Sequence, residues 1–388
     1  MSKSTRGTPS GCRGGVPSHE KGGGELIVTV SKSELARLIE RPCKLAQKQK
    51  ESYLACVKLS VDGSGRLVAE ATDLNDSVRS VCGAAMVSED GEVLVSARML
   101  SKVVKALPDK PVDLTGDGRT VNIACGRSTF DVPSLDPDDF PGLMSPGEVL
   151  SVTVESASLA SLAAHTTYAA KREKEGETVS KKLIMDCVNL KCADGTIRAT
   201  ATDSYRIARS SIPAPDAPDF EMNVPVRMIS DFAKTAGASV TLFGSDATVG
   251  LSSDEDAVVG RAYAGNFPNC DGIIAIEPTT RAEVDRGALL DALKRAAVID
   301  GSDPVILALD DGGINVSRKS DVESMSELVD AKVSAPVVAA LNAVYAVDAV
   351  SNIPSAEVVL EIQDPIKPLR FSGGGCTAIV MPVRMTNG

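Results

Sequence analysis

The sequence predicts an α+β protein built from three tandem copies of one domain. A short β-rich run followed by a capped helix occurs three times, with the runs ending at Val30, Val154 and Val284, which lie 124 and 130 residues apart. Each copy continues with two strand-like runs joined by a turn, and Phe140-Pro141 and Phe267-Pro268 close the first two copies. A repeat of this length is a whole small domain, because the units of solenoid proteins are only about 20–50 residues long.

Each copy is expected to open with a strand and an amphipathic helix. In the first copy Ile27–Val30 is the strand, and Ser31 with Glu34 three residues later forms a capping box. In the third copy Asp285 is the predicted N-cap. The apolar stripes of the three helices contain Leu35, Leu38 and Ile39, then Leu159, Leu162 and Ala163, then Leu289, Leu293 and Ala296. We therefore expect the helices to cover one face of an antiparallel sheet.

A hairpin and a second helix follow in each copy. Asp62-Gly63, Asp194-Gly195 and Asp311-Gly312 separate alternating apolar runs, which is a strong hairpin signal. The segments predicted to begin the second helix are Val95–Leu100, Val224–Ile229 and Val333–Val338. Near the C-terminus, the run Gly373–Gly375 between two strand-like stretches predicts another tight turn.

The repeat gives the domain boundaries. Residues 1–24 contain nine Gly or Pro and four Lys or Arg against one Glu, which is typical of a disordered basic tail of charge +3. The whole chain carries −11, so the remaining body carries −14. The predicted domains are 25–147, 148–277 and 278–388, joined by stretches that contain Pro146 and Pro278.

Composition argues against several classes of protein. With 52 Asp+Glu against 41 Lys+Arg, the bulk charge disfavours a nucleic-acid partner. The longest apolar run, Val337–Val350, contains Asn342 and Asp348 and is shorter than the roughly 18 residues of a membrane span, so no membrane association is expected. The N-terminus lacks the apolar stretch of a signal peptide.

The residues that most catalytic and metal sites use are also scarce. The nine Cys are spread evenly and never form CxxC, which indicates reduced thiols that pack as small core residues. His19 and His165 are the only two His, so neither a zinc site nor a His-dependent triad is expected. There is no GxGxxG and no Gly-Lys dipeptide, and hence no P-loop. We expect no metal, no cofactor and no enzymatic activity.

Four short motifs resemble those of a known family. They are Ala71–Leu74 (ATDL), Ala201–Ala208 (ATDSYRIA), Asn266–Pro268 (NFP) and Ile379–Arg384 (IVMPVR). In this order and spacing, within a threefold repeat, they resemble the bacterial DNA sliding clamp, the beta subunit of DNA polymerase III. The resemblance covers about Glu25 to Met385.

The resemblance implies an architecture and a role. Members of this family have antiparallel sheets outside and two helices per domain facing a central hole, and two three-domain subunits form a head-to-tail homodimeric ring. The ring encircles double-stranded DNA without reading its sequence and tethers the DNA polymerase III catalytic subunit as a processivity factor. A clamp loader opens it, and other replication and repair proteins bind it through a clamp-binding motif. The family acts in the cytoplasm, with the nucleoid, and has no catalytic activity and no cofactor.

The resemblance also gives a role to three base-rich segments. Helices that line the hole attract backbone phosphates through Lys and Arg. Residues 32–50, 171–182 and 286–295 carry local charges of +4, +2 and +2 in an acidic chain. The side chains expected to face DNA are Lys32, Arg37, Arg41, Lys44, Lys48, Lys171, Arg172, Lys181, Lys182, Lys294 and Arg295. The alternative for each segment is an ordinary solvated helix face.

A partner-peptide pocket is implied as well, as an apolar cleft between the second and third domains that receives Leu and Phe side chains of a linear motif. The matching positions are Met185, Thr202, Tyr205, Arg206, Ile207, Pro268, Ile273, Ile366, Pro368, Ile379, Met381, Pro382, Val383 and Arg384. Without the resemblance, these positions would be assigned to core strands.

Two other functions compete with the clamp. A clamp-like repeat scaffold would bind proteins without encircling DNA, and the pocket rim does depart from the family, with Asn269–Gly272 after Phe-Pro and Ser204-Tyr205 in the hairpin. A metal-dependent hydrolase would use Asp73 and Asp203. It is the weaker alternative, because the two carboxylates fall in different domains and a hairpin Asp usually accepts backbone hydrogen bonds.

Overall fold

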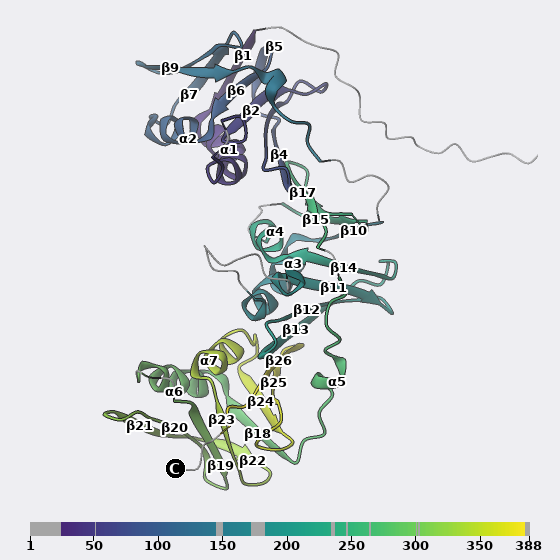
Figure 1. The fold of residues 1–388 in the computed structure, drawn as a ribbon, viewed down its shortest axis with the longest axis vertical. Coiled ribbons are helices and arrows are strands. Elements are labelled where there is room, and N and C mark those ends of the chain that lie inside the picture. The colour runs from purple at the N-terminus through teal and green to yellow at the C-terminus, as the bar shows by residue number, and fades with distance from the viewer. Residues whose placement is uncertain are drawn as a thin grey trace, which may run out of the picture. The chain divides into compact units, whose positions relative to one another are not determined.

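The structure, a computed structural model, describes residues 25–50, 52–144, 150–171, 183–233, 237–245, 247–263, 265–299, 301 and 303–384 (Figure 1). The chain divides into two compact units. The first holds the described residues up to Asp73 together with Arg79–Gly142. The second holds Leu74–Val78 and the described residues from Leu143 onward. A sheet shared between the second and third copies explains why these two copies form one unit.

The first unit combines antiparallel strands with two helices that pack side by side. Its strand order is β5–β1–β7–β8–β9–β6–β2–β3–β4, and β4 begins in the short segment assigned to the second unit. The strands are β1 (Leu26–Ser31), β2 (Cys56–Val61), β3 (Leu67–Thr72), β4 (Asp76–Cys82), β5 (Met86–Asp90), β6 (Val93–Ser96), β7 (Pro111–Gly116), β8 (Thr120–Cys125) and β9 (Ser128–Leu135). The helices are α1 (Lys32–Ala46), α2 (Ala97–Ala106) and the 3-10 turn η1 (Pro137–Asp139).

The second unit contains three runs of hydrogen-bonded strands. Their orders are β10–β15–β16–β17, then β14–β11–β12–β13–β26–β25–β24–β18–β22, then β21–β20–β19–β23. The strands of the second copy are β10 (Leu150–Glu155), β11 (Cys187–Ala193), β12 (Thr196–Thr202), β13 (Arg206–Pro213), β14 (Phe220–Pro225), β15 (Ser239–Gly244), β16 (Thr248–Ser252) and β17 (Asp256–Arg261). Those of the third copy are β18 (Thr280–Asp285), β19 (Val305–Asp310), β20 (Gly313–Lys319), β21 (Ser324–Val329), β22 (Ala331–Val333), β23 (Val337–Leu341), β24 (Glu357–Ile362), β25 (Leu369–Gly373) and β26 (Cys376–Val380).

The helices of the second unit lie between these strands in the sequence. They are α3 (Ser156–Thr166), η2 (Thr167–Ala169), η3 (Leu183–Asp186), α4 (Val226–Phe232), α5 (Asp271–Ile274), α6 (Arg286–Val298) and α7 (Ala343–Ser351).

The threefold repeat is confirmed by the order of the elements. Each copy opens with a strand and a helix (β1–α1, β10–α3, β18–α6) and continues with a three-stranded meander (β2–β3–β4, β11–β12–β13, β19–β20–β21). A strand and a second helix follow (β6–α2, β14–α4, β23–α7), preceded by one additional strand in the first and third copies (β5, β22), and three more strands end the copy. The predicted α+β class and three-domain architecture are therefore confirmed.

Local signals account for many of the element boundaries. Ser31 Oγ accepts a hydrogen bond from the Glu34 N–H at 3.2 Å, and Asp285 Oδ1 accepts one from the Ala288 N–H at 2.8 Å, so both predicted N-caps are confirmed. Between β11 and β12, Asp194 and Gly195 have φ of 52° and 67°. Both values lie in the left-handed region that a two-residue hairpin turn requires.

The second helix of the third copy was placed wrongly by the sequence. Val333–Val338 was predicted to begin it, but Val333 ends β22 and Val337 begins β23, and the helix starts only at Ala343. Val337 and Val338 are β-branched, and such residues favour a strand. Asn342 begins the helix, because its Oδ1 accepts hydrogen bonds from the N–H groups of Val344 and Tyr345 at 3.0 and 3.1 Å.

The predicted apolar stripes form the cores. Leu35, Leu38, Leu159, Leu289 and Leu293 are each 0% exposed. All eight Cys among the described residues are free and buried, as the even spacing of Cys predicted. In the part of the chain that the structure describes, no helix is both long and apolar enough to cross a membrane.

Candidate functional site

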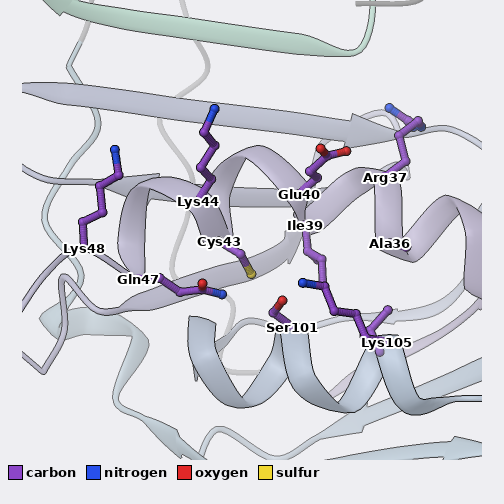
Figure 2. Close-up of a pocket in the computed structure, with 11 residues that line it drawn as sticks. Ala36, Arg37, Ile39, Glu40, Cys43, Lys44, Gln47, Lys48, Ser101 and Lys105 are labelled. Atoms are coloured by element: carbon purple, nitrogen blue, oxygen red, sulfur yellow. The ribbon is translucent and has the colours of Figure 1, made fainter. Parts of the chain in front are cut away.

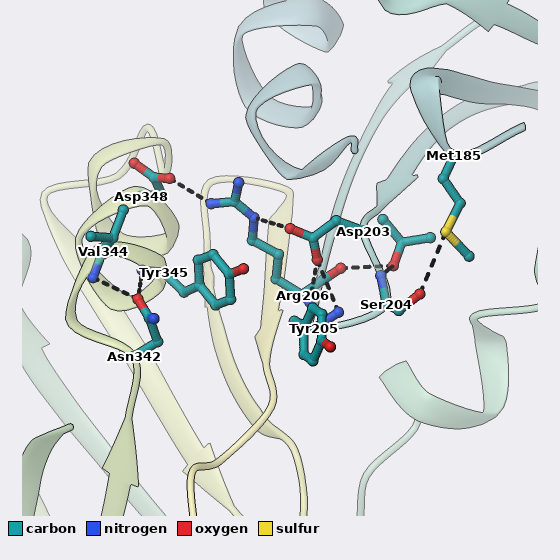
Figure 3. Close-up of polar contacts among 10 residues, drawn as sticks. Met185, Asp203, Ser204, Tyr205, Arg206, Asn342, Val344, Tyr345 and Asp348 are labelled. Atoms are coloured by element: carbon teal, nitrogen blue, oxygen red, sulfur yellow. Dashed lines mark hydrogen bonds and ion pairs between the residues drawn. The ribbon is translucent and has the colours of Figure 1, made fainter. Parts of the chain in front are cut away.

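Three of the predicted pocket residues, Thr202, Tyr205 and Arg206, lie at the turn between β12 and β13, and Figure 3 shows the polar contacts of this turn. Asp203 Oδ1 accepts hydrogen bonds from the N–H groups of Tyr205 and Arg206 at 2.9 and 3.0 Å, which confirms the expected role of this hairpin aspartate. Thr202 Oγ1 donates to the Arg206 carbonyl oxygen at 2.8 Å and accepts from the Ser204 N–H at 3.2 Å. Ser204 has a φ of 81°, in the left-handed region. The turn presents the Tyr205 side chain to solvent, with Tyr205 62% exposed.

Arg206 connects the second and third copies. Its Nε donates to Asp203 Oδ2 at 2.9 Å, and its Nη1 donates to Asp348 Oδ2 on α7 (Figure 3). The guanidinium carbon lies 4.5 Å from the ring centroid of Tyr345 and 5.7 Å from that of Tyr168. Only 13% of the Arg206 side chain is exposed, so two carboxylates and two aromatic rings replace most of its water. This set of contacts fixes one conformation of the turn against α7.

Two tyrosines meet where α7 approaches the turn. The rings of Tyr205 and Tyr345 are stacked, with centroids 6.5 Å apart and an interplanar angle of 29°. Asn342, the N-cap of α7, bonds the Tyr345 N–H and so holds the start of the helix that carries this ring. Burial raises the pKa of Tyr345 and also that of Tyr168, so both phenols stay neutral at physiological pH.

An apolar floor lies beside the turn. Ile207, Cys270 and Ile379 form a buried cluster, and Phe267 and Ile274 pack against it. Antiparallel pairing of β13 with β26 places Ile207 directly opposite Ile379. Strands far apart in the sequence therefore meet in one apolar cluster, in which Ile207 is 6% and Ile379 1% exposed.

The residues after β26 form the rim of this floor. Met381 is 38% exposed, and its N–H donates to the Tyr205 carbonyl oxygen at 2.9 Å. Val383 is 39% exposed, and its N–H donates to the Ala340 carbonyl oxygen at 2.8 Å. Pro382 forms an isolated bridge with Leu341. Flexible Met at a half-exposed rim is suited to binding varied apolar side chains.

Other predicted pocket residues lie at different distances from the turn. Met185 is adjacent, because the Ser204 hydroxyl donates to its sulfur at 3.4 Å. Pro268 borders the floor, because its carbonyl oxygen accepts from the Cys270 thiol at 3.4 Å. Ile273 lies on α5, Ile366 and Pro368 lie on the loop between β24 and β25, and Arg384 follows the last strand.

Sequence reasoning missed Tyr168, Asn342, Tyr345 and Asp348. Asn342 followed by an apolar run is an N-cap signal that would have located α7. No local signal brings Tyr168 or Asp348 to Arg206, because Asp348 is 142 residues away along the chain.

Helix α1 carries several basic residues of the first copy, and residues of α1 and α2 line a hollow of about 770 Å³ (Figure 2). Arg37, Glu40, Lys44 and Lys48 line the hollow from the α1 side, and Lys105 lines it from α2. These five residues give the hollow a net charge of +3, since four are cationic and one is acidic. Lys105 is a basic residue that the sequence reasoning did not include.

Several predicted DNA-facing residues already have partners in the protein. Lys32 Nζ bonds the Leu107 carbonyl oxygen, and Arg37 Nη2 bonds Glu34 at 3.2 Å and the Val81 carbonyl oxygen at 3.0 Å. Arg295 forms two hydrogen bonds with Glu327, at 2.7 and 2.6 Å. Their charges are therefore partly compensated.

The remaining predicted DNA-facing residues differ in exposure. Lys294 is exposed on α6, Lys171 is half-buried after η2, and Arg41 is half-buried on α1. Arg172, Lys181 and Lys182 lie outside the described residues.

Comparison with known proteins covers all three copies. Models of the DNA polymerase III beta subunit match in order: the N-terminal domain at residues 26–144, the central domain at 153–269 and the C-terminal domain at 272–384. The beta sliding clamp of Streptomyces coelicolor is 28% identical over 344 residues, which are 83% of this chain and 89% of that protein. The beta sliding clamp of Caulobacter vibrioides is 27% identical over 349 residues, which are 86% and 92% of the two chains.

Solved structures agree in fold. The DNA polymerase III beta subunit of Thermotoga maritima superposes with a TM-score of 0.84 at 24% identity, covering 93% of this chain and 100% of that one. The C. crescentus beta sliding clamp gives a TM-score of 0.84 at 25% identity, with coverages of 94% and 100%. Since the three domain models match in order and leave few residues between 26 and 384 unmatched, the chain belongs to the DNA polymerase III beta subunit family, the bacterial DNA sliding clamps.

Proposed function

We propose that the protein is a DNA polymerase processivity clamp, a homodimeric ring that encircles double-stranded DNA in the cytoplasm, at the nucleoid. The observation that carries the proposal is the ordered match of all three clamp domains on a chain that repeats the same fold three times. The role is mechanical: the ring holds a polymerase near its template and needs no catalytic residue and no cofactor of its own.

We propose that the ring closes through the same kind of strand pairing that joins the second and third copies within the chain. In the second unit, β13 of one copy pairs antiparallel with β26 of the next. The strand that corresponds to β13 in the third copy is β21, which lies at the end of its sheet. The strand that corresponds to β26 in the first copy is β9, whose residues Ser128–Asp131 pair with β8 on one side. Two such strands on different subunits would pair head to tail.

The internal junction also gives a register for the proposed interface. The cross-strand pair next to the β12–β13 turn is Thr202 and Ile207, and the corresponding pair next to the β20–β21 turn of the third copy is Lys319 and Ser324. Likewise, the pair next to the β25–β26 turn is Gly373 and Cys376, and its counterpart in the first copy is Cys125 and Ser128. Ala208 lies opposite Ala378 in the internal junction. The equivalent pair across the ring interface is Met325 and Phe130 of the partner subunit, a favourable contact between a thioether and an aromatic ring.

DNA is proposed to pass along the basic helices. The hollow between α1 and α2 has a net charge of +3, and α6 presents exposed Lys294, in a chain with a net charge of −11. Scattered Lys and Arg without aromatic platforms contact phosphates without reading bases, which suits sliding. The acidic remainder of the surface discourages DNA from binding elsewhere.

The cleft at the β12–β13 turn is proposed to bind the partners. The apolar floor of Ile207 and Ile379 with the adaptable rim of Met381 fits Leu and Phe side chains of a linear motif. The proposed partners are the catalytic subunit of DNA polymerase III, the clamp loader, and other replication and repair proteins that carry such a motif.

The test is topological. We would load the protein onto a nicked circular plasmid with a clamp loader and compare its retention by gel filtration before and after one restriction cut. A ring stays on the circle and slides off the linear DNA. Equal retention on both forms would contradict encirclement and leave the protein-binding scaffold as the better description.

A matched variant makes the test sharper. The pair Phe130→Cys and Met325→Cys is expected to form disulfides between subunits, giving a covalent dimer on a non-reducing gel, while each single variant stays monomeric there. Once oxidised on the plasmid, this ring should withstand denaturation without leaving the circle. A protein that is dimeric in solution but shows no cross-link would contradict the proposed register.

A further inference from the structure

A small polar pocket of about 240 Å³ lies beside the proposed peptide cleft. Strands β11, β12, β13 and β14 form one wall, and the segment Phe267–Asp271 forms the other. Three cationic side chains line it: Lys191, Arg198 and Arg209. None of these belongs to the proposed cleft or to the basic helices, so neither of those sites accounts for this pocket.

The cations are arranged at a cost to stability. Lys191 and Arg198 lie directly opposite each other in the β11–β12 ladder, and like charges at such positions destabilise a sheet. Lys191 has Glu221 at 3.5 Å, and Arg209 binds Asp271 at 2.7 Å. Arg198 makes no hydrogen bond or ion pair with any described residue. The pKa of Asp271 is lowered mainly by the hydrogen bond and charge of Arg209, and to a smaller extent by the charge of Arg198.

The charge count indicates which ligand fits. Three cations and the two carboxylates of Glu221 and Asp271 leave the pocket with a net charge of +1. A single carboxylate would neutralise it, whereas a phosphate dianion would leave an excess of negative charge. Arg198 offers the planar fork of donors that binds a carboxylate with two parallel hydrogen bonds.

The position of the pocket points to the source of that carboxylate. Pro268 lines the pocket and also borders the apolar floor of the cleft. Along β12, Arg198 and Thr202 point to the same face of the sheet, and Thr202 lies opposite Ile207 of the floor. Four residues of extended strand span roughly 13 Å, which is also the reach of about four residues of an extended peptide.

We propose that this pocket binds the side-chain carboxylate of an Asp or Glu that flanks the apolar motif of a clamp-binding peptide. The inference rests on the proposed peptide cleft and extends it by a charged subsite around Arg198. A partner with an acidic residue about four positions from its apolar anchor is held at both ends. Partners without one are held by the cleft alone, so the subsite ranks partners that compete for one ring.

The experiment uses the full-length protein and fluorescein-labelled peptides that carry a Leu-Phe motif. One series places a Glu three, four or five residues before or after the motif, and a matched series has Gln at the same positions. At low salt, one of the Glu peptides is expected to bind about two- to fivefold more tightly than its Gln match in fluorescence anisotropy. This advantage should disappear in Arg198→Gln and persist in Arg119→Gln, an exposed control on the first unit.

The outcomes separate the subsite from the cleft. If every Glu peptide binds like its Gln match, or if the advantage persists in Arg198→Gln, the subsite is overturned while the cleft stands. If no peptide binds the wild-type protein, both proposals fall.

Thermal unfolding gives a second readout. If Arg198 served only to stabilise the sheet, Arg198→Gln would lower the melting temperature. Because Arg198→Gln removes the repulsion with Lys191, the variant is expected to melt at the same temperature as the wild type or higher. A lower melting temperature would assign Arg198 to the stability of the sheet and overturn the proposal.

Discussion

Arg206 shows how a single side chain can join two copies of the repeat. It lies on the second copy, yet Asp348 and Tyr345 of the third copy supply an ion pair and a ring face. A guanidinium that is mostly buried needs such partners, because losing its water without compensation would cost several kcal/mol. The turn after β12 is therefore held against α7 by polar contacts, beside the apolar cluster of Ile207 and Ile379.

Replacing Asp348 with Asn is expected to weaken peptide binding without unfolding the protein. Arg206 keeps its bond to Asp203, so the effect should be partial, about two- to tenfold in Kd for a Leu-Phe peptide measured by fluorescence anisotropy. Asp330→Asn, at an exposed position in the same copy, is the matched control. Equal affinities for the two variants would show that Arg206 needs only Asp203.

The buried thiols give a prediction about pH. Burial raises the pKa of Cys43 to about 12 and that of Cys56 to about 11, from an ordinary value of 9.0. Because the folded pKa is the higher one, the stability these thiols contribute is fully present below pH 9 and is lost as the pH rises from 9 toward 12. Denaturant titrations should therefore show a lower free energy of unfolding at pH 10.5 than at pH 8, with a smaller decrease in Cys43→Ala.

Alkylation offers an independent check of the same thiols. At pH 8 only on the order of one Cys43 in ten thousand is a thiolate in the folded protein, so iodoacetamide should label it slowly until the chain is unfolded. Equal labelling of Cys43 in native and denatured protein, measured by mass spectrometry, would contradict the burial of this thiol.

At the scale of elements, two helix caps in one domain do different work. Asn342 caps α7, which carries Tyr345 and Asp348 to Tyr205 and Arg206, whereas Asp285 caps α6, which contributes no residue to this group of contacts. Asn342→Ala and Asp285→Ala are each expected to lower the free energy of unfolding by about 1 kcal/mol. Only Asn342→Ala should also weaken peptide binding, since the start of α7 then frays. If both variants bind peptide equally well, α7 is positioned by its packing alone.

Elements with strong local signals were predictable from the sequence. The caps at Ser31 and Asp285 and the hairpin at Asp194-Gly195 follow short-range rules that the rest of the chain does not override. The helix predicted at Val333–Val338 was wrong, because the β-branched residues of this segment favour strands despite its similarity to the helical segments of the other copies. Strand pairing between copies, such as β13 with β26, has no local signal at all.

At the scale of the whole molecule, a net charge of −11 accompanies helices that carry basic residues. Replacing Lys44 and Lys48 with Gln is expected to weaken non-specific DNA binding at low salt. For every Lys–phosphate interaction that the substitutions remove, the slope of log K against log salt should fall by about one unit, measured by fluorescence titration with a duplex. Lys332→Gln, on strand β22, is the control and should leave the slope unchanged. An unchanged slope in the double variant would place α1 away from the DNA.

The candidate site was only partly predictable from the sequence. The motif around Tyr205 and Arg206 and the C-terminal motif name residues that meet in the structure, since Ile207 packs with Ile379 and Met381 bonds the Tyr205 carbonyl oxygen. The contacts of Tyr345 and Asp348 with this turn were missed because they depend on how two copies share a sheet. Motifs locate residues, but the tertiary pairing of strands decides which of them meet.

The junction of β13 with β26 forms within one chain, so it does not depend on protein concentration. Linked partners have an effective concentration on the order of millimolar, whereas a junction between separate subunits depends on how much free protein the cell contains. At micromolar protein, the same strand pairing is therefore favoured about a thousandfold more inside the chain than between chains. In the proposed ring, dilution should therefore separate the subunits long before it separates the second copy from the third, and DNA would enter where two chains meet.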